Sequence, residues 1–420
     1  MADDDSTPKP EANPGVPIML QLTPMNPPYR EDPYTVLADL RARCPVLKDE
    51  GYGSVILTRY DDVRSIVSDL TMWRDPFKGE ESLVERLVAS GELPEGPRSE
   101  VTSILTLDDP DHARIRQPLA QALYARVAKF RPEVERIVGE TLDAIDASGP
   151  FDLMTSFCVP IPIDVIASIL GVEHSRLAEF RAWSEGVIQS LNPFRNEEQT
   201  KAMEAAREAL DVYFTRLIAE RKADPRDDLI SDMTRLQAAG LAVTDGELRI
   251  NLQALLIGGN LTTTDLIGNA VRLLLKNPTE LAKLRADPAL INAVVEEALR
   301  YEPPVDATGR IAPREMEFSG CPVKQKESLS LFLRAANRDP QVFENPDAFD
   351  VTRAKKPHVA FGGGAHICIG APLARLEAQV ALLRLFERFP NLRLADPDAA
   401  PVWRTLPFFR GLERLELRAD

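Results

Sequence analysis

The chain has 420 residues, of which 44% are hydrophobic and 27% are charged, and its formal net charge is −15. This composition is typical of a soluble globular protein, and the length provides ample material for a large core. The acidic balance argues against a general nucleic-acid binder, because neutralising phosphates needs a basic surface, and no apolar run is long enough to span a bilayer.

At the N-terminus, the segment MADDDSTPKPEANPG is acidic and rich in proline, and it lacks the basic region and apolar stretch of a signal peptide. We therefore expect residues 1–24 to form a disordered lead into a cytoplasmic protein. No later linker is rich enough in glycine or serine to separate autonomous units, so residues 25–420 are predicted to form a single domain.

Helical patterning dominates this domain, with apolar residues recurring at intervals of three and four. Helices are predicted at residues 33–44, 60–70, 111–130, 132–148, 162–172, 200–223, 245–276, 291–301 and 372–389, and short strands at 53–59, 310–323, 327–333 and 412–418. The expected fold is mainly α with a minor β region. Two stretches, 74–106 and 190–200, are rich in proline, glycine and charge, and are as typical of binding loops as of plain surface loops.

The helix predicted over residues 245–276 would be roughly 48 Å long, enough to cross the whole domain. Its middle reads IGGNLTTT, with Gly258 and Gly259 inside the helix. Each glycine costs a helix interior about 1 kcal/mol relative to alanine. A flat ligand pressed against the helix backbone would account for both.

The four cysteines are far apart and form no CxxC pair, so neither a zinc site nor a disulfide scaffold is predicted. Only Cys368, in FGGGAHICIG (361–370), has an unusual setting, on a glycine-rich loop directly before a predicted helix. Unpaired N–H groups and the helix dipole at such a position lower the pKa of a thiol. The sulfur could attack a substrate or ligate a metal; His366, two residues away, does not by itself make a catalytic dyad.

The stretch FGGGAHICIG resembles the haem-ligand loop of the cytochrome P450 family, in which a cysteine thiolate is the axial ligand of the iron. The resemblance implies the P450 fold, with haem b (iron protoporphyrin IX) between the long central helix and the cysteine loop. It makes Cys368 the iron ligand. It also implies cofactor contacts from residues that match the family's motifs, namely His112, Arg116, Gly258, Gly259, Arg310, Phe361, His366 and Gly370.

Glu297 and Arg300, in VVEEALRYEPP, stand three apart and so share a helix face. Taken alone, they would be a solvated ion pair of little energetic value. With the resemblance, they match the family's Glu-x-x-Arg signature, which braces the core beneath the cysteine loop. The family's usual third partner, an arginine, is replaced by Ala348 in PDAF, and Arg353 is a candidate substitute.

The central helix departs from the family's Ala/Gly-Gly-x-Asp/Glu-Thr pattern, because Leu261 stands where the acid is expected. The resemblance implies that the hydroxyl of Thr262 supports water near the bound oxygen. The protons that cleave the O–O bond must then arrive by another route, for which Asn260, Thr263 and Asp265 are candidates. A solvated or helix-bracing role for Asp265 is at least as well supported.

The resemblance implies a monooxygenase of the soluble bacterial class that activates O2 and hydroxylates, or otherwise oxidises, a hydrophobic small organic molecule. The matching pocket positions are mostly apolar: Trp73, Phe77, Ile104, Leu105, Trp183, Leu255, Leu261, Val305, Ala307, Thr308 and Phe408. Leu261 leaves open an enzyme of this fold without oxygen insertion, such as one for nitric oxide reduction, oxidative coupling or desaturation. A haem gas sensor or electron carrier is a third and weaker interpretation.

Electrons are expected from a separate ferredoxin and its NAD(P)H-dependent reductase, with no membrane or nucleic-acid partner, and the protein is expected to be a monomer. The carrier would dock on the cysteine side, where an acidic protein is attracted by basic side chains. The residues predicted to gather there are Arg116, Arg126, Lys129, Lys355, Lys356 and Arg375.

Overall fold

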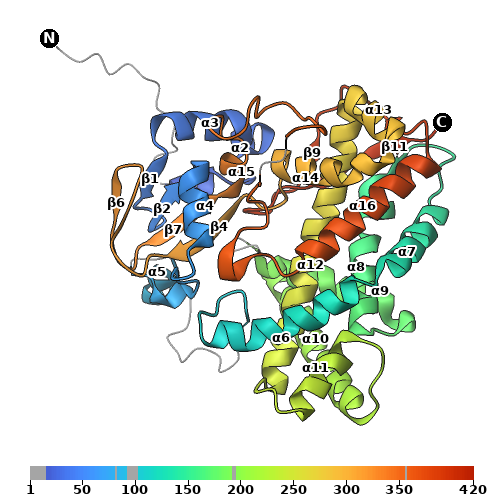
Figure 1. The fold of residues 1–420 in the computed structure, drawn as a ribbon, viewed down its shortest axis with the longest axis horizontal. Helices are drawn as coiled ribbons and strands as arrows, with labels where there is room; N and C mark the ends of the chain where they lie inside the picture. The colour runs from blue at the N-terminus through green and yellow to red at the C-terminus, as the bar shows by residue number, and fades with distance from the viewer. Residues whose placement is uncertain (1–15, 81–82, 92–102, 192–194, 355–356) are drawn as a thin grey trace.

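The computed structural model describes residues 16–80, 83–91, 103–191, 195–354 and 357–420. Figure 1 shows a β-rich part, built from the first quarter of the chain and a later segment, beside a larger part made of long helices. The predicted class, mainly α with a minor β region, is confirmed. Every helix among the described residues is too short or too polar to cross a membrane.

The β-rich part is organised around a four-stranded mixed sheet in the order β1-β2-β7-β4. Its strands are β1 (Val46–Asp49), β2 (Ser54–Leu57), β7 (Ser328–Phe332) and β4 (Ala307–Ile311). Strand β2 pairs in parallel with β7, whereas β1 pairs antiparallel with β2 and β4 with β7. The parallel pairing therefore joins the start of the chain to a segment more than two hundred residues later.

The remaining strands are short and lie in small sheets of their own. A hairpin joins β5 (Met316–Phe318) to β6 (Cys321–Val323), and another joins β9 (Val402–Trp403) to β10 (Leu412–Arg414). Strand β11 (Glu416–Arg418) lies between β3 (Phe151–Asp152) and β8 (Arg393–Leu394).

The helices occupy both parts of the molecule. Around the sheet lie α1 (Ile18–Gln21), α2 (Pro27–Glu31), α3 (Pro33–Arg43), α4 (Tyr60–Ser68), α5 (Leu83–Ala89) and α15 (Leu333–Ala336). The helical part consists of α6 (Asp111–Val127), α7 (Arg131–Asp143), α8 (Pro160–Leu170), α9 (Leu177–Ile188), α10 (Glu197–Ala223), α11 (Leu229–Ala238), α12 (Asp245–Lys276), α13 (Pro278–Ala286), α14 (Ile291–Tyr301) and α16 (Ala371–Arg388).

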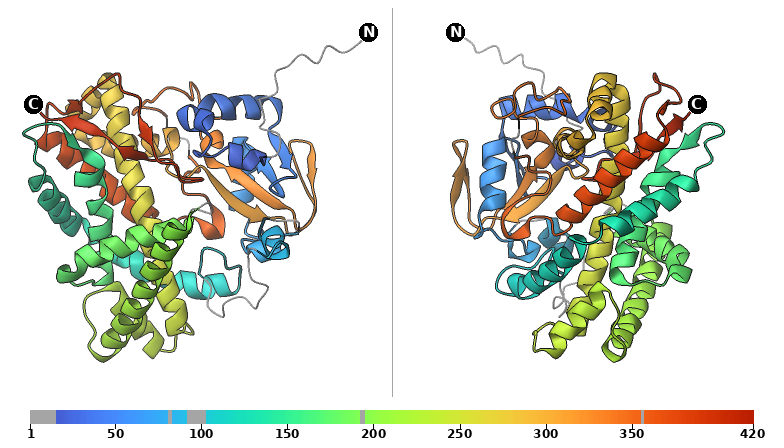
Figure 2. Two further views of the ribbon diagram at one scale, coloured as in Figure 1. Left: turned by 180° about the vertical axis from the view of Figure 1, so that it is seen from behind. Right: turned by 45° about the vertical axis from the view of Figure 1, so that its right-hand side comes forward.

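Helix α12 is the central element of the helical part, as both views in Figure 2 show. It begins at a capping box in which Thr244 accepts from the backbone N–H of Glu247, and the Glu247 side chain accepts from that of Thr244. It packs against α8, α9, α10, α14 and α16, and most of its side chains are buried. The helix predicted over residues 245–276 is confirmed in full.

Three sequence predictions need correction. The expected lead over residues 1–24 is wrong for its last part, because α1 forms there and Met19 and Leu22 are buried against the sheet; residues 1–15 lie outside the described residues. The helix predicted over 132–148 ends at Asp143. Helices α9, α11 and α13 were not predicted, and they fill stretches left without an element.

The two unassigned stretches contain both described and undescribed residues. In 74–106, a short 3-10 turn at Pro76–Lys78 precedes α5, and residues 81–82 and 92–102 lie outside the described part of the chain. In 190–200, the start of α10 is described and residues 192–194 are not.

Candidate active site

The cysteine loop turns tightly against the end of α4 before it enters α16. Gly362 and Gly364 have φ angles of 68° and 60°, in the left-handed region that favours glycine. A Cβ atom on Gly364 would lie 2.6 Å from the backbone oxygen of Val67, so a larger residue does not fit there. The N–H of Cys368 donates to the oxygen of Phe361 at 2.9 Å, which closes the loop.

This geometry leaves the Cys368 side chain exposed directly before the N-terminus of α16. Its thiol is accessible to solvent but is surrounded by many protein atoms, and the resulting desolvation raises its pKa. Backbone N–H groups of Gly370 and Ala371, together with Arg116 and Arg375, act in the opposite direction without reversing the shift. The lowered thiol pKa expected from the helix N-terminus is therefore outweighed in the protein without a metal.

Four of the predicted contact residues converge beside this loop. The rings of His112 and His366 lie 4.1 Å apart, and Arg116 donates to the backbone oxygen of Ile367. A pocket lined by Trp73, His112, Arg310 and His366, among others, opens next to them. The structure thus gathers side chains from α6, β4 and the cysteine loop, which are far apart in sequence.

Two acidic groups, Asp108 and Asp109, lie among the cations of this cluster, and Asp109 contacts His112 at 3.6 Å. His112 is buried and its Nε2 atom has no hydrogen-bond partner among the described residues. Burial and the neighbouring Arg74 together lower the pKa of Arg310 to about 9, against the opposing effect of Asp108. The pKa of His366 falls to about 3 because of burial and of the nearby His112 and arginines. An acidic ligand would relieve this repulsion and satisfy the unpaired donors.

On the other side of the site, α12 presents an open stretch of backbone. A Cβ atom on Gly258 or Gly259 would meet no atom within 4 Å. Thr262 donates from its hydroxyl to the backbone oxygen of Gly258 at 2.8 Å. Leu261 and Asn260 are buried, and the Nδ2 atom of Asn260 has no partner. The space above the two glycines and the unpaired donors around the pocket fit a flat molecule with carboxylate groups.

Asp265 is not available as the proton donor considered above. It is completely buried, and both of its carboxylate oxygens contact Arg404, at 3.0 and 3.1 Å. Burial raises the pKa of Asp265 to about 6, while Arg404 acts to lower it. The structure therefore supports the helix-bracing alternative for this residue and corrects its assignment as catalytic.

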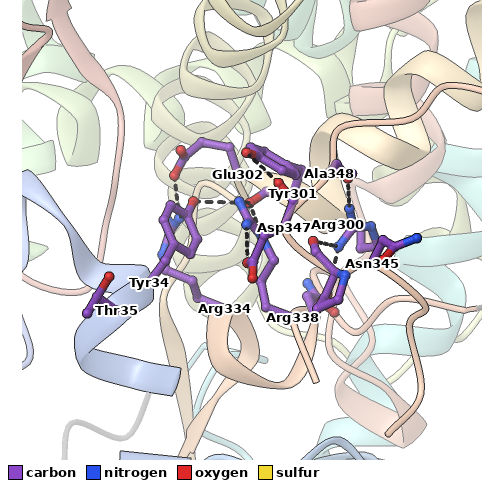
Figure 3. Close-up of polar contacts among 12 residues, drawn as sticks. Tyr34, Thr35, Arg300, Tyr301, Glu302, Arg334, Arg338, Asn345, Asp347 and Ala348 are labelled. Atoms are coloured by element: carbon purple, nitrogen blue, oxygen red, sulfur yellow. Dashed lines mark hydrogen bonds and ion pairs between the residues drawn. The ribbon is translucent and has the colours of Figure 1, made fainter. Parts of the chain in front are cut away.

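Glu297 and Arg300 form a buried ion pair with contacts of 2.7 and 2.8 Å. Arg353 lies against the same carboxylate, with its Nε 3.1 Å from Glu297 Oε1, and it also donates to the oxygens of Asn345 and Ala348. Arg300 donates to the oxygen of Ala348 as well (Figure 3). Arg353 therefore occupies the place of the expected third partner. At position 348, Ala348 contributes its backbone oxygen, which accepts hydrogen bonds from Arg300 and Arg353.

A second charged cluster, which the sequence did not predict, lies beside this brace. Arg334 is fully buried and contacts Glu302 and the hydroxyl of Tyr34 (Figure 3). It also donates to the carboxylate of Asp306. Strong attraction to Arg334 and Arg410 holds the pKa of Glu302 at about 2, against the effect of burial. The cluster ties the N-terminal helices to the segment between α14 and β4, and no short-range pattern in the sequence announces it.

Two further groups near the site were also missed. Arg74 donates to the oxygen of Leu105 at 3.0 Å and to the hydroxyl of Thr308 at 2.9 Å, and so joins the cationic cluster. Glu377, on α16, is buried with Oε2 unpaired, and burial raises its pKa well above the ordinary value. Glu377 is four residues from both Leu373 and Ala381, which lie on the apolar face of the helix. This spacing in the sequence indicated that Glu377 is buried.

The predicted pocket residues are not all brought together. Ile104, Leu255 and Leu261 are buried, whereas Phe77 and Leu105 are more than half exposed. Val305 pairs with Phe409 across an isolated bridge, and Ala307 and Phe408 pack against the N-terminal core cluster. Trp183 lies in an outer groove between α9 and α10, against Tyr213 and Arg176. Its assignment to the pocket is therefore wrong.

Comparison with known proteins gives a consistent result. The model of the family described as "Cytochrome P450" matches residues 95–397. Cytochrome P450 107B1 of Saccharopolyspora erythraea is 40% identical over 371 residues, which cover 88% of this chain and 90% of that protein. The 6-deoxyerythronolide B hydroxylase of the same organism is 37% identical over 398 residues, covering 93% and 97%. The solved structure of P450BioI in complex with acyl carrier protein ligated to hexadec-9Z-enoic acid has a TM-score of 0.82 and 33% identity, covering 93% of this chain and 99% of that one.

Proposed function

The chain belongs to the cytochrome P450 family of monooxygenases, which bind haem b, and from this premise we propose that it hydroxylates a hydrophobic small organic molecule with electrons from a separate ferredoxin and its reductase. The observation that carries the proposal is the site itself. An exposed cysteine on a closed loop lies near Arg116, a pocket that contains His112, Arg310 and His366 opens beside that loop, and α12 has open space above Gly258 and Gly259.

In this proposal, Cys368 would bind the haem iron through its sulfur, and the cationic cluster would hold the carboxylates of the haem. His112, Arg116, Arg310 and His366 would donate to those carboxylates, and Arg74 would add a further donor. The two glycines of α12 allow the flat ring to approach the helix backbone. When bound, the haem supplies the activation of O2 and the transfer of one oxygen atom to the substrate.

The protein's own groups then position the substrate and supply protons. Leu255 and Leu261 present apolar surface on α12, which favours a hydrophobic substrate and excludes water. The Thr262 hydroxyl, anchored to Gly258, can accept a hydrogen bond from water in the groove. Because Asp265 is paired with Arg404, we propose that protons reach the groove through water that contacts the Thr262 hydroxyl and the side-chain amide of Asn260.

The alternative without oxygen insertion rests on Leu261, which cannot transfer a proton. The name of the relative called 6-deoxyerythronolide B hydroxylase supports oxygen insertion for that protein, and its 37% identity to this chain makes oxygen insertion the better proposal here. Turnover under labelled O2 separates the two: hydroxylation places one labelled atom in the product, whereas coupling or desaturation places none.

The decisive test of the site is Cys368→Ser, because serine removes the thiolate and changes little else. We expect the reduced, CO-treated variant to lose the red-shifted Soret band that thiolate ligation produces. Cys321→Ser, which alters a partly buried thiol in the β5–β6 hairpin, is the matched control and should keep that band. An unchanged spectrum in Cys368→Ser would exclude the proposed ligand.

A further inference from the structure

The connection between β9 and β10 carries Phe408 and Phe409, and its tip is bound to the segment that precedes β4. The N–H of Asp306 donates to the oxygen of Phe408 at 2.9 Å, and the N–H of Arg410 donates to the oxygen of Pro304 at 2.9 Å. Between these two bonds, Phe409 faces Val305 across an isolated antiparallel bridge. The tip therefore forms one wall with residues 304–306.

The base of the same connection is bound to α12. Arg404 donates through one nitrogen to both carboxylate oxygens of Asp265, and its backbone N–H donates to the oxygen of Gly411 at 2.9 Å. A Cβ atom on Gly411 would lie 1.8 Å from Asp265 Oδ1. The carboxylate of Asp265 thus occupies space that only a glycine at 411 leaves free. Helix α12 therefore packs closely against the base of the connection.

The tip has a backbone conformation that its own sequence does not favour. Phe408 has a φ angle of 63°, which non-glycine residues, and bulky ones above all, rarely adopt. Residues held in such conformations persist only where the surroundings fix them. The two sets of contacts just described provide that restraint, one at the tip and the other at the base.

We propose that Asp265 is a positioning residue of the substrate pocket, which acts through Arg404 to fix the wall formed by Phe409 and residues 304–306 relative to Thr262. The inference rests on the proposed function, because it takes the groove at Gly258–Thr262 as the place where the substrate binds. Asp265 follows Thr262 by three residues on α12. The Asp265–Arg404 ion pair therefore fixes the wall at a defined position relative to the groove. The ligands affected are bulky hydrophobic molecules that extend from the groove to this wall.

The test compares two azole ligands of different size by their effect on the Soret band. Imidazole is too small to reach the wall, whereas clotrimazole, a triarylmethyl imidazole, extends into the pocket. For Asp265→Asn, we expect the dissociation constant of clotrimazole to rise about fivefold or more and that of imidazole to change less than about twofold. A loss of affinity that depends on ligand size is not expected from general destabilisation.

Variants of the partner make the test independent of how well Asp265→Asn folds. Arg404 is partly exposed, so Arg404→Gln should fold and reproduce the size-dependent loss, while Arg404→Lys, which keeps the charge, should restore most of the affinity. Arg393→Gln is the matched control, because Arg393 pairs with Asp420 at the surface. Hydrogen exchange at the backbone N–H groups of Arg404 and Arg410 should accelerate in Arg404→Gln and remain unchanged in the control.

The proposal is overturned if the variants bind both azoles more weakly by the same factor. It is also overturned if they bind both azoles as the wild type does and hydrogen exchange at residues 404 and 410 is unchanged. An altered solvent isotope effect on O2 consumption with unchanged azole binding would also overturn it, in favour of proton transfer by Asp265. A wild-type protein whose Soret band responds to neither azole would overturn the proposed function instead, and hydrogen exchange would still decide whether Asp265 and Arg404 fix the connection.

Discussion

A buried carboxyl group without a partner is costly when it is charged, and Glu377 is such a group. It lies on the buried face of α16, and desolvation is the cause that raises its pKa. The other strongly shifted carboxyls near the site differ, because nearby cations hold the pKa values of Glu296 and Glu302 at about 2. Glu377 is therefore the group in this part of the molecule best placed to retain a proton at neutral pH.

This difference gives a pH dependence with a defined sign. A carboxyl whose pKa is raised on folding stabilises the protein fully below its unfolded pKa, and the contribution is lost as the pH rises through the folded pKa. Glu377→Gln does not titrate, so its melting temperature should rise relative to the wild type between pH 5 and pH 8. The size of this relative rise reports how far the folded pKa of Glu377 lies above its unfolded value, since one pKa unit corresponds to about 1.4 kcal/mol.

The control for this comparison is on the same helix. Glu387 is mostly exposed and pairs with Arg384, so Glu387→Gln makes the same chemical change without altering a buried group. Its melting temperature should keep a constant offset from the wild type over the same pH range. An equal offset at pH 5 and pH 8 for Glu377→Gln would show that burial does not raise the pKa of Glu377 in the folded protein.

At the scale of the elements, helix α14 and the segment after α15 are joined by the Glu297, Arg300 and Arg353 side chains. Arg353 is only slightly exposed and contacts one carboxylate oxygen and several backbone oxygens. Its fork of donors therefore adds to the contacts that Arg300 and Tyr301 make with the same segment. The segment leads directly toward the cysteine loop, so its position bears on the site.

We expect Arg353→Ala to lower the free energy of unfolding by about 3 kcal/mol, because it leaves the buried Glu297 partly uncompensated. Arg353→Lys should recover less than half, since lysine keeps the charge but cannot reproduce the planar set of donors. Denaturant unfolding of the purified variants measures both.

The matched control is Arg414→Ala, which removes an exposed arginine paired with Glu416 and should cost less than about 1 kcal/mol. If Arg353→Ala costs no more than this control, then Arg353 does not serve as the third partner of the brace.

The same elements show what the sequence could predict. Long, strongly periodic helices such as α12 and α14 were predicted with their observed ends, because burial on one face imposes the pattern. Helix α9 was missed, although Phe180, Ser184 and Val187 line its buried face, because no element was assigned to its segment. The four-stranded sheet could not be derived, since its parallel β2–β7 pair joins residues more than two hundred positions apart.

The site shows the same limit at the level of contacts. The cysteine loop and the Glu297–Arg300 pair lie in local motifs and were found from them. The partners that decide the roles of other residues are distant in sequence: Arg404 is 139 residues from Asp265, and Thr308 is 234 residues from Arg74. A single sequence does not reveal such pairs, which is why Asp265 was taken for a proton donor and Arg74 was overlooked.

At the scale of the whole molecule, a net charge of −15 disfavours approach of an acidic electron carrier unless its docking face is locally basic. Two of the basic residues predicted to gather there are already paired, Arg126 with Asp232 and Arg375 with Glu296. Lys355 and Lys356 lie outside the described residues. Lys129, which follows α6, is exposed and has no acidic partner among the residues that the structure describes.

Lys129→Glu should therefore slow reduction by a ferredoxin about threefold to tenfold at low ionic strength, and less than about twofold at high ionic strength, where salt screens the attraction. Stopped-flow measurement of the reduced, CO-bound form gives the rate. Lys201→Glu, on α10, makes the same change of charge on a helix that packs against α9, α11 and α12, and should leave the rate unchanged. Because both variants carry the same net charge, equal slowing would assign the effect to the overall charge of the molecule. An unchanged rate in both would place the docking face elsewhere.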